Sequence, residues 1–81
     1  DDPIVHLFPS PLRQDELLHF KTDFHEGFEV KIQDLMGREL ENFLFHESSG
    51  SFKMSNYRKG QYLILITSGA KQIVQKIMIY E

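Results

Sequence analysis

The stretch Gly60–Tyr80, GQYLILITSGAKQIVQKIMIY, contains two apolar runs separated by a short break. Residues 62–66 are continuously apolar, rich in β-branched and aromatic side chains, and too few for a solitary helix, which predicts a strand buried on both faces. Residues 72–80 alternate in character, although Val74 and Met78 blur the pattern. Their apolar parity comprises Ile73, Ile77 and Ile79, and their polar parity Gln72, Lys76 and Tyr80. The break Ser68-Gly69-Ala70 predicts a tight hairpin, because glycine accepts a positive φ. We therefore expect this hairpin to form the structural core.

Length and composition restrict the classes of protein that this chain can represent. Its 81 residues predict a single domain, 1–81, with a modest core and little room for a deep catalytic cleft. The formal charge of −3 argues against a nucleic-acid partner, which requires a concentrated basic face. Without cysteine, disulfides and cysteine-based zinc sites are excluded. The chain opens on Asp1-Asp2-Pro3 and not on methionine, so we expect it to be excised from a larger secreted protein.

The first half of the chain predicts further strands. Ile4–Phe8 is apolar and is followed by Pro9-Ser10-Pro11, which favours a strand at the edge of a sheet, since proline cannot donate a ladder hydrogen bond. Glu16–Lys21 is interpreted as a strand from its context. Residues 28–33 alternate strictly between apolar and polar, as in a strand with one buried face. Asp34-Leu35-Met36-Gly37 then predicts a turn, with the Asp34 side chain as a cap and Gly37 in the left-handed conformation.

The sequence pattern after residue 37 predicts secondary structure less clearly. Arg38–Phe45 is favoured as the return strand, but a helix over Glu39–Glu47 also fits its apolar spacing. We expect a turn at residues 48–50 and a short strand at Ser51–Met54. The total is about seven short strands and no crossover helix, so the sheets should be antiparallel. The predicted fold is all-β, a small β-sandwich of immunoglobulin-like architecture.

No pattern in the chain indicates catalysis, a metal site or a cofactor. The four histidines are not spaced as metal ligands, and the glycines are isolated at turns. The dipeptide His25-Glu26 could act as an acid–base pair but has no evident nucleophile beside it. Three aromatic residues, Phe24, Phe52 and Tyr57, could instead form a platform for sugars, with packing in or around the core as the other interpretation. An extracellular carbohydrate- or protein-binding module of a larger enzyme is therefore the alternative function.

Four ordered motifs resemble the C-terminal sorting domain of type IX secretion substrates in Bacteroidetes. Residues 7–11 (LFPSP) are similar to the opening aromatic-Pro-Asn-Pro segment of that family, and residues 30–38 (VKIQDLMGR) to its middle strand ending in Asp-x-x-Gly-Arg. Residues 60–66 (GQYLILI) are similar to its Gly-x-Tyr strand, and residues 76–79 (KIMI) to its terminal Lys-containing strand. The chain departs from the family at Ser10, where asparagine is usual, and at Phe8, where tyrosine is common. Serine preserves the small polar character of the turn, so we expect little effect on the fold, and an effect on export if the translocon reads that asparagine directly.

The resemblance implies a non-enzymatic role as an address for secretion. The domain would direct an N-terminal cargo through the outer-membrane type IX translocon to the cell surface or the medium, by way of the periplasm. In many members a sortase-like peptidase then removes the domain, and the cargo is attached to surface lipopolysaccharide. The motif positions that are candidates for recognition or turn geometry are Pro9, Pro11, Asp34, Gly37, Gly60, Tyr62 and Lys76. Tyr62 is expected to pack in the core with its hydroxyl hydrogen-bonded at the rim.

The last strand is the segment that we expect a partner to contact. Its polar parity carries Lys76, and Glu81 would place a carboxylate near the edge of the sheet. A partner could add a strand to that edge, which also allows a weak homodimer. Deletion of the final residues is then expected to abolish export of a folded reporter.

Overall fold

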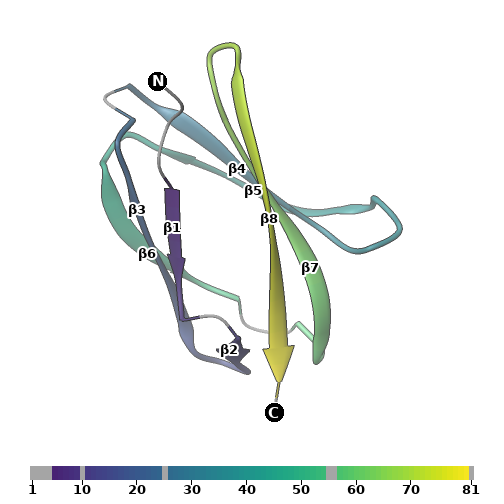
Figure 1. Cartoon of the computed structure of the whole chain (residues 1–81). Helices are drawn as coiled ribbons and strands as arrows, with labels where there is room; N and C mark the ends of the chain where they lie inside the picture. Colours follow the sequence, from purple (N-terminus) through teal and green to yellow (C-terminus); the bar gives the residue numbers. More distant parts are fainter. Residues whose placement is uncertain (1–4, 10, 25, 55–56, 81) are drawn as a thin grey trace.

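The computed structural model describes residues 5–9, 11–24, 26–54 and 57–80, and these residues form eight strands and no helix. The strands are β1 (Val5–Phe8), β2 (Leu12–Arg13), β3 (Leu17–Thr22), β4 (Phe28–Gln33), β5 (Glu39–Phe45), β6 (Ser49–Lys53), β7 (Gly60–Ser68) and β8 (Lys71–Tyr80). They build two sheets that face each other (Figure 1). The all-β prediction is confirmed. No segment among these residues is a helix of the length and apolarity needed to cross a membrane.

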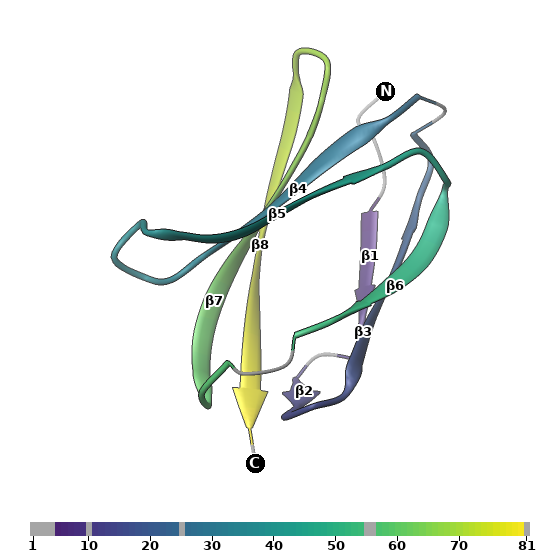
Figure 2. The ribbon, with the colours of Figure 1, turned by 180° about the vertical axis from the view of Figure 1, so that it is seen from behind.

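The larger sheet has the strand order β2-β8-β7-β4-β5 and the smaller one β1-β3-β6. Seen from behind in Figure 2, the β4–β5 and β7–β8 turns project beyond the area that the smaller sheet covers. Every strand pair is antiparallel except β2 with β8. The prediction of purely antiparallel sheets is wrong for this pair. β2 follows β1 in the chain but belongs to the larger sheet, where it runs parallel to β8.

The predicted strands agree with the structure in most places. β1 is an edge strand that ends at Phe8, directly before Pro9, and β5 is the return strand, so the helical alternative is wrong. β7 and β8 form the expected hairpin, in which Ser68 pairs with Lys71 across a two-residue loop. Gly69 opens that loop with φ 61°, a value that glycine adopts without strain.

β6 differs from its prediction because Gly50 is not part of a turn. The strand begins at Ser49, and Gly50 pairs with Phe20 on β3. A Cβ added at Gly50 would lie 2.8 Å from the Phe20 ring, so the ring occupies the space that a side chain would need. The glycine therefore serves close packing of an aromatic ring across two strands.

The core lies between the two sheets. β4 alternates buried and half-buried residues along its whole length, as its period of two predicts. Phenylalanine rings fill one end, with the Phe20 and Phe45 centroids 4.6 Å apart and Phe28 edge-on to Phe20 at 5.4 Å. The prediction that residues 62–66 are buried on both faces is wrong. Ile64 and Ile66 are buried, but residues 63 and 65 are only half-buried, because no second layer among the described residues covers their side of the sheet.

Candidate recognition surface

The β4–β5 turn is held together by the carboxylate of Asp34. Its Oδ1 accepts hydrogen bonds from the backbone N–H groups of Met36 and Arg38, both at 2.9 Å, and its Oδ2 accepts one from Arg38 Nε at 2.9 Å. Gly37 takes φ 87° and donates its N–H to the Asp34 carbonyl at 3.0 Å. The predicted roles of Asp34 as a cap and Gly37 as a left-handed residue are confirmed.

These contacts stabilise the charged form of Asp34. The backbone N–H of Arg38 is the largest cause, followed by its side chain, and together they hold the pKa of the Asp34 carboxyl below its ordinary value of 3.8. The carboxylate is therefore charged at neutral pH and available for these bonds. Leu35 and Met36 stand exposed at its tip, Met36 with 89% of its surface accessible.

A bulge in β5 changes which face of the sheet the residues next to the turn occupy. Ile32 pairs with Glu41, whereas Gln33 pairs with Glu39, so Leu40 has no partner on β4. Glu41 is thereby set on the parity of the core, where its Oε1 accepts a hydrogen bond from the Tyr57 hydroxyl.

Tyr57 and Tyr62 form a stacked pair with ring centroids 5.3 Å apart. Burial, and next the hydrogen bond to Glu41, raise the pKa of Tyr57, which keeps its hydroxyl protonated. The Tyr62 hydroxyl donates to the Arg58 carbonyl at 2.7 Å. Tyr62 packs against the core and bonds at its rim, as predicted.

The turn, the bulge and the tyrosine pair surround a shallow pocket of about 380 Å³. We call it the turn pocket, and it is lined by Asp34, Arg38, Leu40, Tyr57, Arg58 and Tyr62. Two of the predicted motif residues, Asp34 and Tyr62, are therefore brought together, although they are far apart in the sequence. Tyr57 was considered for a sugar platform and not for this pocket, and Arg58 was missed, because its only sequence signal is the basic pair Arg58-Lys59 in a turn-like segment.

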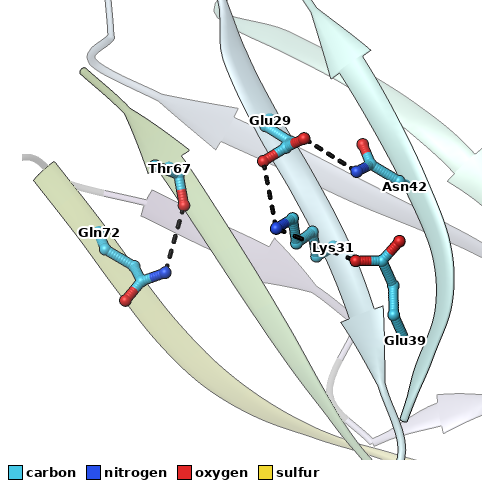
Figure 3. Close-up of polar contacts among 6 residues, drawn as sticks. All are labelled: Glu29, Lys31, Glu39, Asn42, Thr67 and Gln72. Atoms are coloured by element: carbon cyan, nitrogen blue, oxygen red, sulfur yellow. Dashed lines mark hydrogen bonds and ion pairs between the residues drawn. The ribbon is translucent and has the colours of Figure 1, made fainter. Parts of the chain in front are cut away.

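The outer face is the side of the five-stranded sheet that points away from β1, β3 and β6. Its polar half lies on β4 and β5, where Lys31 Nζ is 3.8 Å from Glu29 and 3.9 Å from Glu39 (Figure 3). Asn42 donates to Glu29 Oε2 at 2.8 Å. On β7 and β8, Gln72 donates to Thr67 at 3.4 Å, also drawn in Figure 3. On this face the Lys31 ammonium group thus lies near the carboxylates of both Glu29 and Glu39, so each of these groups has a partner of opposite charge.

The half of the outer face on β7 and β8 is more apolar. Val74 and Met78 are exposed, with 55% and 46% of their surface accessible, beside the half-buried Leu65 and Leu63. Lys76 lies opposite Leu63 and is exposed, and among the described residues no hydrogen bond or ion pair holds its ammonium group. The parities predicted for β8 are confirmed at Lys76, Ile77 and Ile79. Lys76 is not part of the turn pocket.

The remaining motif positions lie around the end of β8. Pro9 and Pro11 flank the crossing to β2, and Gly60 opens β7 opposite Ile79 with φ 147°. Within the described residues, the free side of β8 pairs only with β2, at Ile79 and Tyr80, so its edge from Gln72 to Met78 has no ladder partner there. Gln14 donates its N–H to the Tyr80 carbonyl at 2.6 Å. Ser10, His25 and Glu81, on which further expectations rested, lie outside the described residues.

The proposed sugar platform does not form as a surface. Phe52 is buried in the core, and Phe24 is half-buried against Phe28 with centroids 5.6 Å apart. Tyr57 has one ring face covered by Tyr62. The packing interpretation of these three aromatic residues is the one that the structure supports.

The described residues form a small all-β domain of two sheets, with the four motifs in order along it. The family model of the secretion system C-terminal sorting domain matches residues 6–80, and the chain belongs to this family. It is thus a sorting domain of the type IX secretion system. No curated protein matches the chain.

Proposed function

We propose that this domain is a non-catalytic address that directs an N-terminal cargo across the outer membrane through the type IX translocon. The observation that carries the proposal is the family match over residues 6–80, which includes all of β1 but Val5 and every later strand. Export of the cargo to the cell surface or the medium follows from that role, by way of the periplasm. Removal of the domain by a sortase-like peptidase and anchoring of the cargo belong to the same proposal. We also propose that residues 1–81 form a single sorting domain carried by a larger secreted protein.

The surface that supports this role is the last strand. The unpaired edge of β8 offers backbone groups to which a partner could add a strand. Beside that edge, Lys76 is exposed and unpaired among the described residues, next to the apolar side chains of Val74 and Met78. We propose that a translocon component contacts this half of the outer face. The same edge would also support a weak homodimer.

Truncation is a poor test of this proposal, because β8 belongs to the core as well as to the surface. Ile77 and Ile79 are each only 1% exposed, and Ile79 pairs with both Gly60 and Leu12. Deletion of the last residues would damage the fold together with any signal. A substitution on the outer parity separates the two effects.

The experiment fuses the domain to a periplasmic reporter in a type IX-competent cell and compares Lys76→Glu with Lys53→Glu. Both lysines are exposed and both changes invert one charge, but Lys53 lies on β6, in the other sheet. We expect export of the wild-type and Lys53→Glu fusions and reduced export of Lys76→Glu, with unchanged thermal unfolding for all three domains. Retention of the wild-type fusion in the periplasm would refute the sorting function. Normal export of Lys76→Glu would refute the assignment to β8.

We also infer that the sandwich is immunoglobulin-like. The order β8-β7-β4-β5 with β1-β3-β6 in the facing sheet supports this, since it agrees with a G-F-C-C′ sheet opposite an A-B-E sheet. Cross-strand proton contacts by NMR between β3 and both β1 and β6 are the expected result. Their absence would contradict this architecture.

A further inference from the structure

The residues that line the turn pocket have a net positive formal charge. Two arginines and one aspartate line it, in a chain whose formal charge is −3. The Asp34 carboxylate is engaged by Arg38 and by backbone N–H groups, and Glu41 accepts the Tyr57 hydroxyl. Both carboxylates therefore have a hydrogen-bond donor within the domain, and that of Asp34 is also paired with the Arg38 guanidinium.

Arg58 is the charged residue of this pocket whose side chain is available to a ligand. Its side chain is exposed, and no hydrogen bond or ion pair reaches its guanidinium from the residues that the structure describes. Only its carbonyl is used, as the acceptor of the Tyr62 hydroxyl, and this bond fixes the backbone from which the side chain projects. Arg38 bonds to Asp34 through Nε, and 79% of its side chain is accessible. Guanidinium groups presented in this way match the geometry of a carboxylate.

The rest of the lining is apolar and rigid. Leu40 is placed there by the bulge, and the two tyrosines are held by their stacking and by both of their hydroxyl bonds. One face of each tyrosine ring is covered by the other ring, which disfavours stacking of a sugar. A phosphate would leave the apolar wall unused. The lining instead fits a carboxylate joined to an apolar side chain, as in a peptide segment with adjacent acidic and apolar residues.

We propose that the turn pocket binds a carboxylate-bearing peptide segment of a protein partner, with Arg58 on the carboxylate and Leu40, Tyr57 and Tyr62 against its apolar neighbour. The turn and the tyrosine pair are already held by bonds within the domain, so within the pocket the ordering cost of docking falls mainly on the Arg58 side chain. The partner would be a protein of the secretion machinery, and this part of the inference rests on the proposed function. The pocket is a second contact, separate from the outer face of β8.

NMR titration of the isotope-labelled domain tests the pocket without knowledge of the partner. The probe is N-acetyl-L-phenylalanine, which joins a carboxylate to an aromatic group, and its matched control is the uncharged N-acetyl-L-phenylalanine amide. We expect saturable shifts of the Leu40, Arg58 and Tyr62 backbone signals with the acid only. Arg58→Gln should weaken binding about tenfold, whereas Lys53→Gln on the other sheet should not change it. Equal binding of acid and amide, equal binding by Arg58→Gln, or stronger shifts of these signals with inorganic phosphate or glucose would overturn the proposal.

Export of the reporter fusion gives the second readout. Reduced export of Arg58→Gln, with unchanged thermal unfolding, is the result expected if the pocket engages the secretion machinery. Normal export of this variant would overturn that part of the inference even if the probe binds. Failure of the wild-type fusion to be exported would instead refute the sorting function, and the titration would still decide whether the pocket binds a carboxylate.

Discussion

The carboxylate of Asp34 shows how much one side chain contributes to a turn. Both of its oxygens are used, and the resulting bonds order the tip that carries Leu35 and Met36. This residue was predictable from the sequence, because Asp-x-x-Gly after an alternating strand has a known turn chemistry. Its carboxylate also pairs with Arg38 in the turn pocket. Among the described residues, Arg58 is therefore the arginine of that pocket whose guanidinium has no partner.

Asp34→Asn tests the charge of this residue through the pH dependence of stability. Asparagine retains an acceptor oxygen but loses the charge that Arg38 binds. Because the pKa of Asp34 in the folded state is lowered from 3.8, its stabilisation is present above that value and is lost as the pH falls through the lower folded-state pKa. We expect the wild-type domain to melt at a higher temperature than Asp34→Asn at pH 7, and the difference to close at strongly acidic pH. A difference that is independent of pH would show that the charge is irrelevant.

Gly50→Ala tests the packing of the Phe20 ring. The new methyl group would approach the ring to 2.8 Å, so either the ring or the strand must move. We expect a loss of about 1–3 kcal/mol in the free energy of unfolding, measured by urea denaturation. Ser51→Ala, at the exposed neighbouring position on β6, is the control and should cost much less. Equal costs would contradict the packing role of Gly50.

At the scale of elements, the sequence predicted strands better than it predicted layers. Strict alternation identified β4, and Ser-Gly between apolar runs identified the β7–β8 hairpin. The run at residues 62–66 suggested two buried faces, but whether a second layer covers the outer face depends on contacts far along the chain. Gly50 was misassigned for a similar reason, because its partner, Phe20, lies on another strand. The turn pocket could not be predicted, since it joins β5, β7 and two connecting segments.

The order of the strands in the larger sheet predicts a pattern of hydrogen exchange. β7 and β4 have neighbours on both sides, whereas β5 pairs only with β4 in the described sheet. We expect the slowest amide exchange at residues 62–67 and 29–33, and alternating fast and slow exchange along β5. NMR exchange measurements check this order. Exchange along β5 as slow as that in β7 would contradict its position at the edge.

At the scale of the whole molecule, adjacent residues of β8 belong to different environments. Ile77 is 1% exposed between the two sheets, and Met78 is 46% exposed on the outer face. Ile77→Ala should cost about 2–5 kcal/mol of folding free energy because it leaves a cavity, while Met78→Ala should change stability by less than about 0.5 kcal/mol. Urea denaturation of both variants makes the comparison. Similar losses for the two would contradict a single core on one side of β8.

The position of β7 and β8 in the larger sheet has a consequence for the timing of protein synthesis. A nascent chain that stops before residue 60 carries only the β4–β5 hairpin and β2 of that sheet, so Leu12 and Arg13 have no strand to join. The core can close only after Ile77 and Ile79 have left the ribosome and reached their places between the sheets. A translation product that stops before residue 60 would therefore lack the folded core, however complete the polypeptide that precedes it.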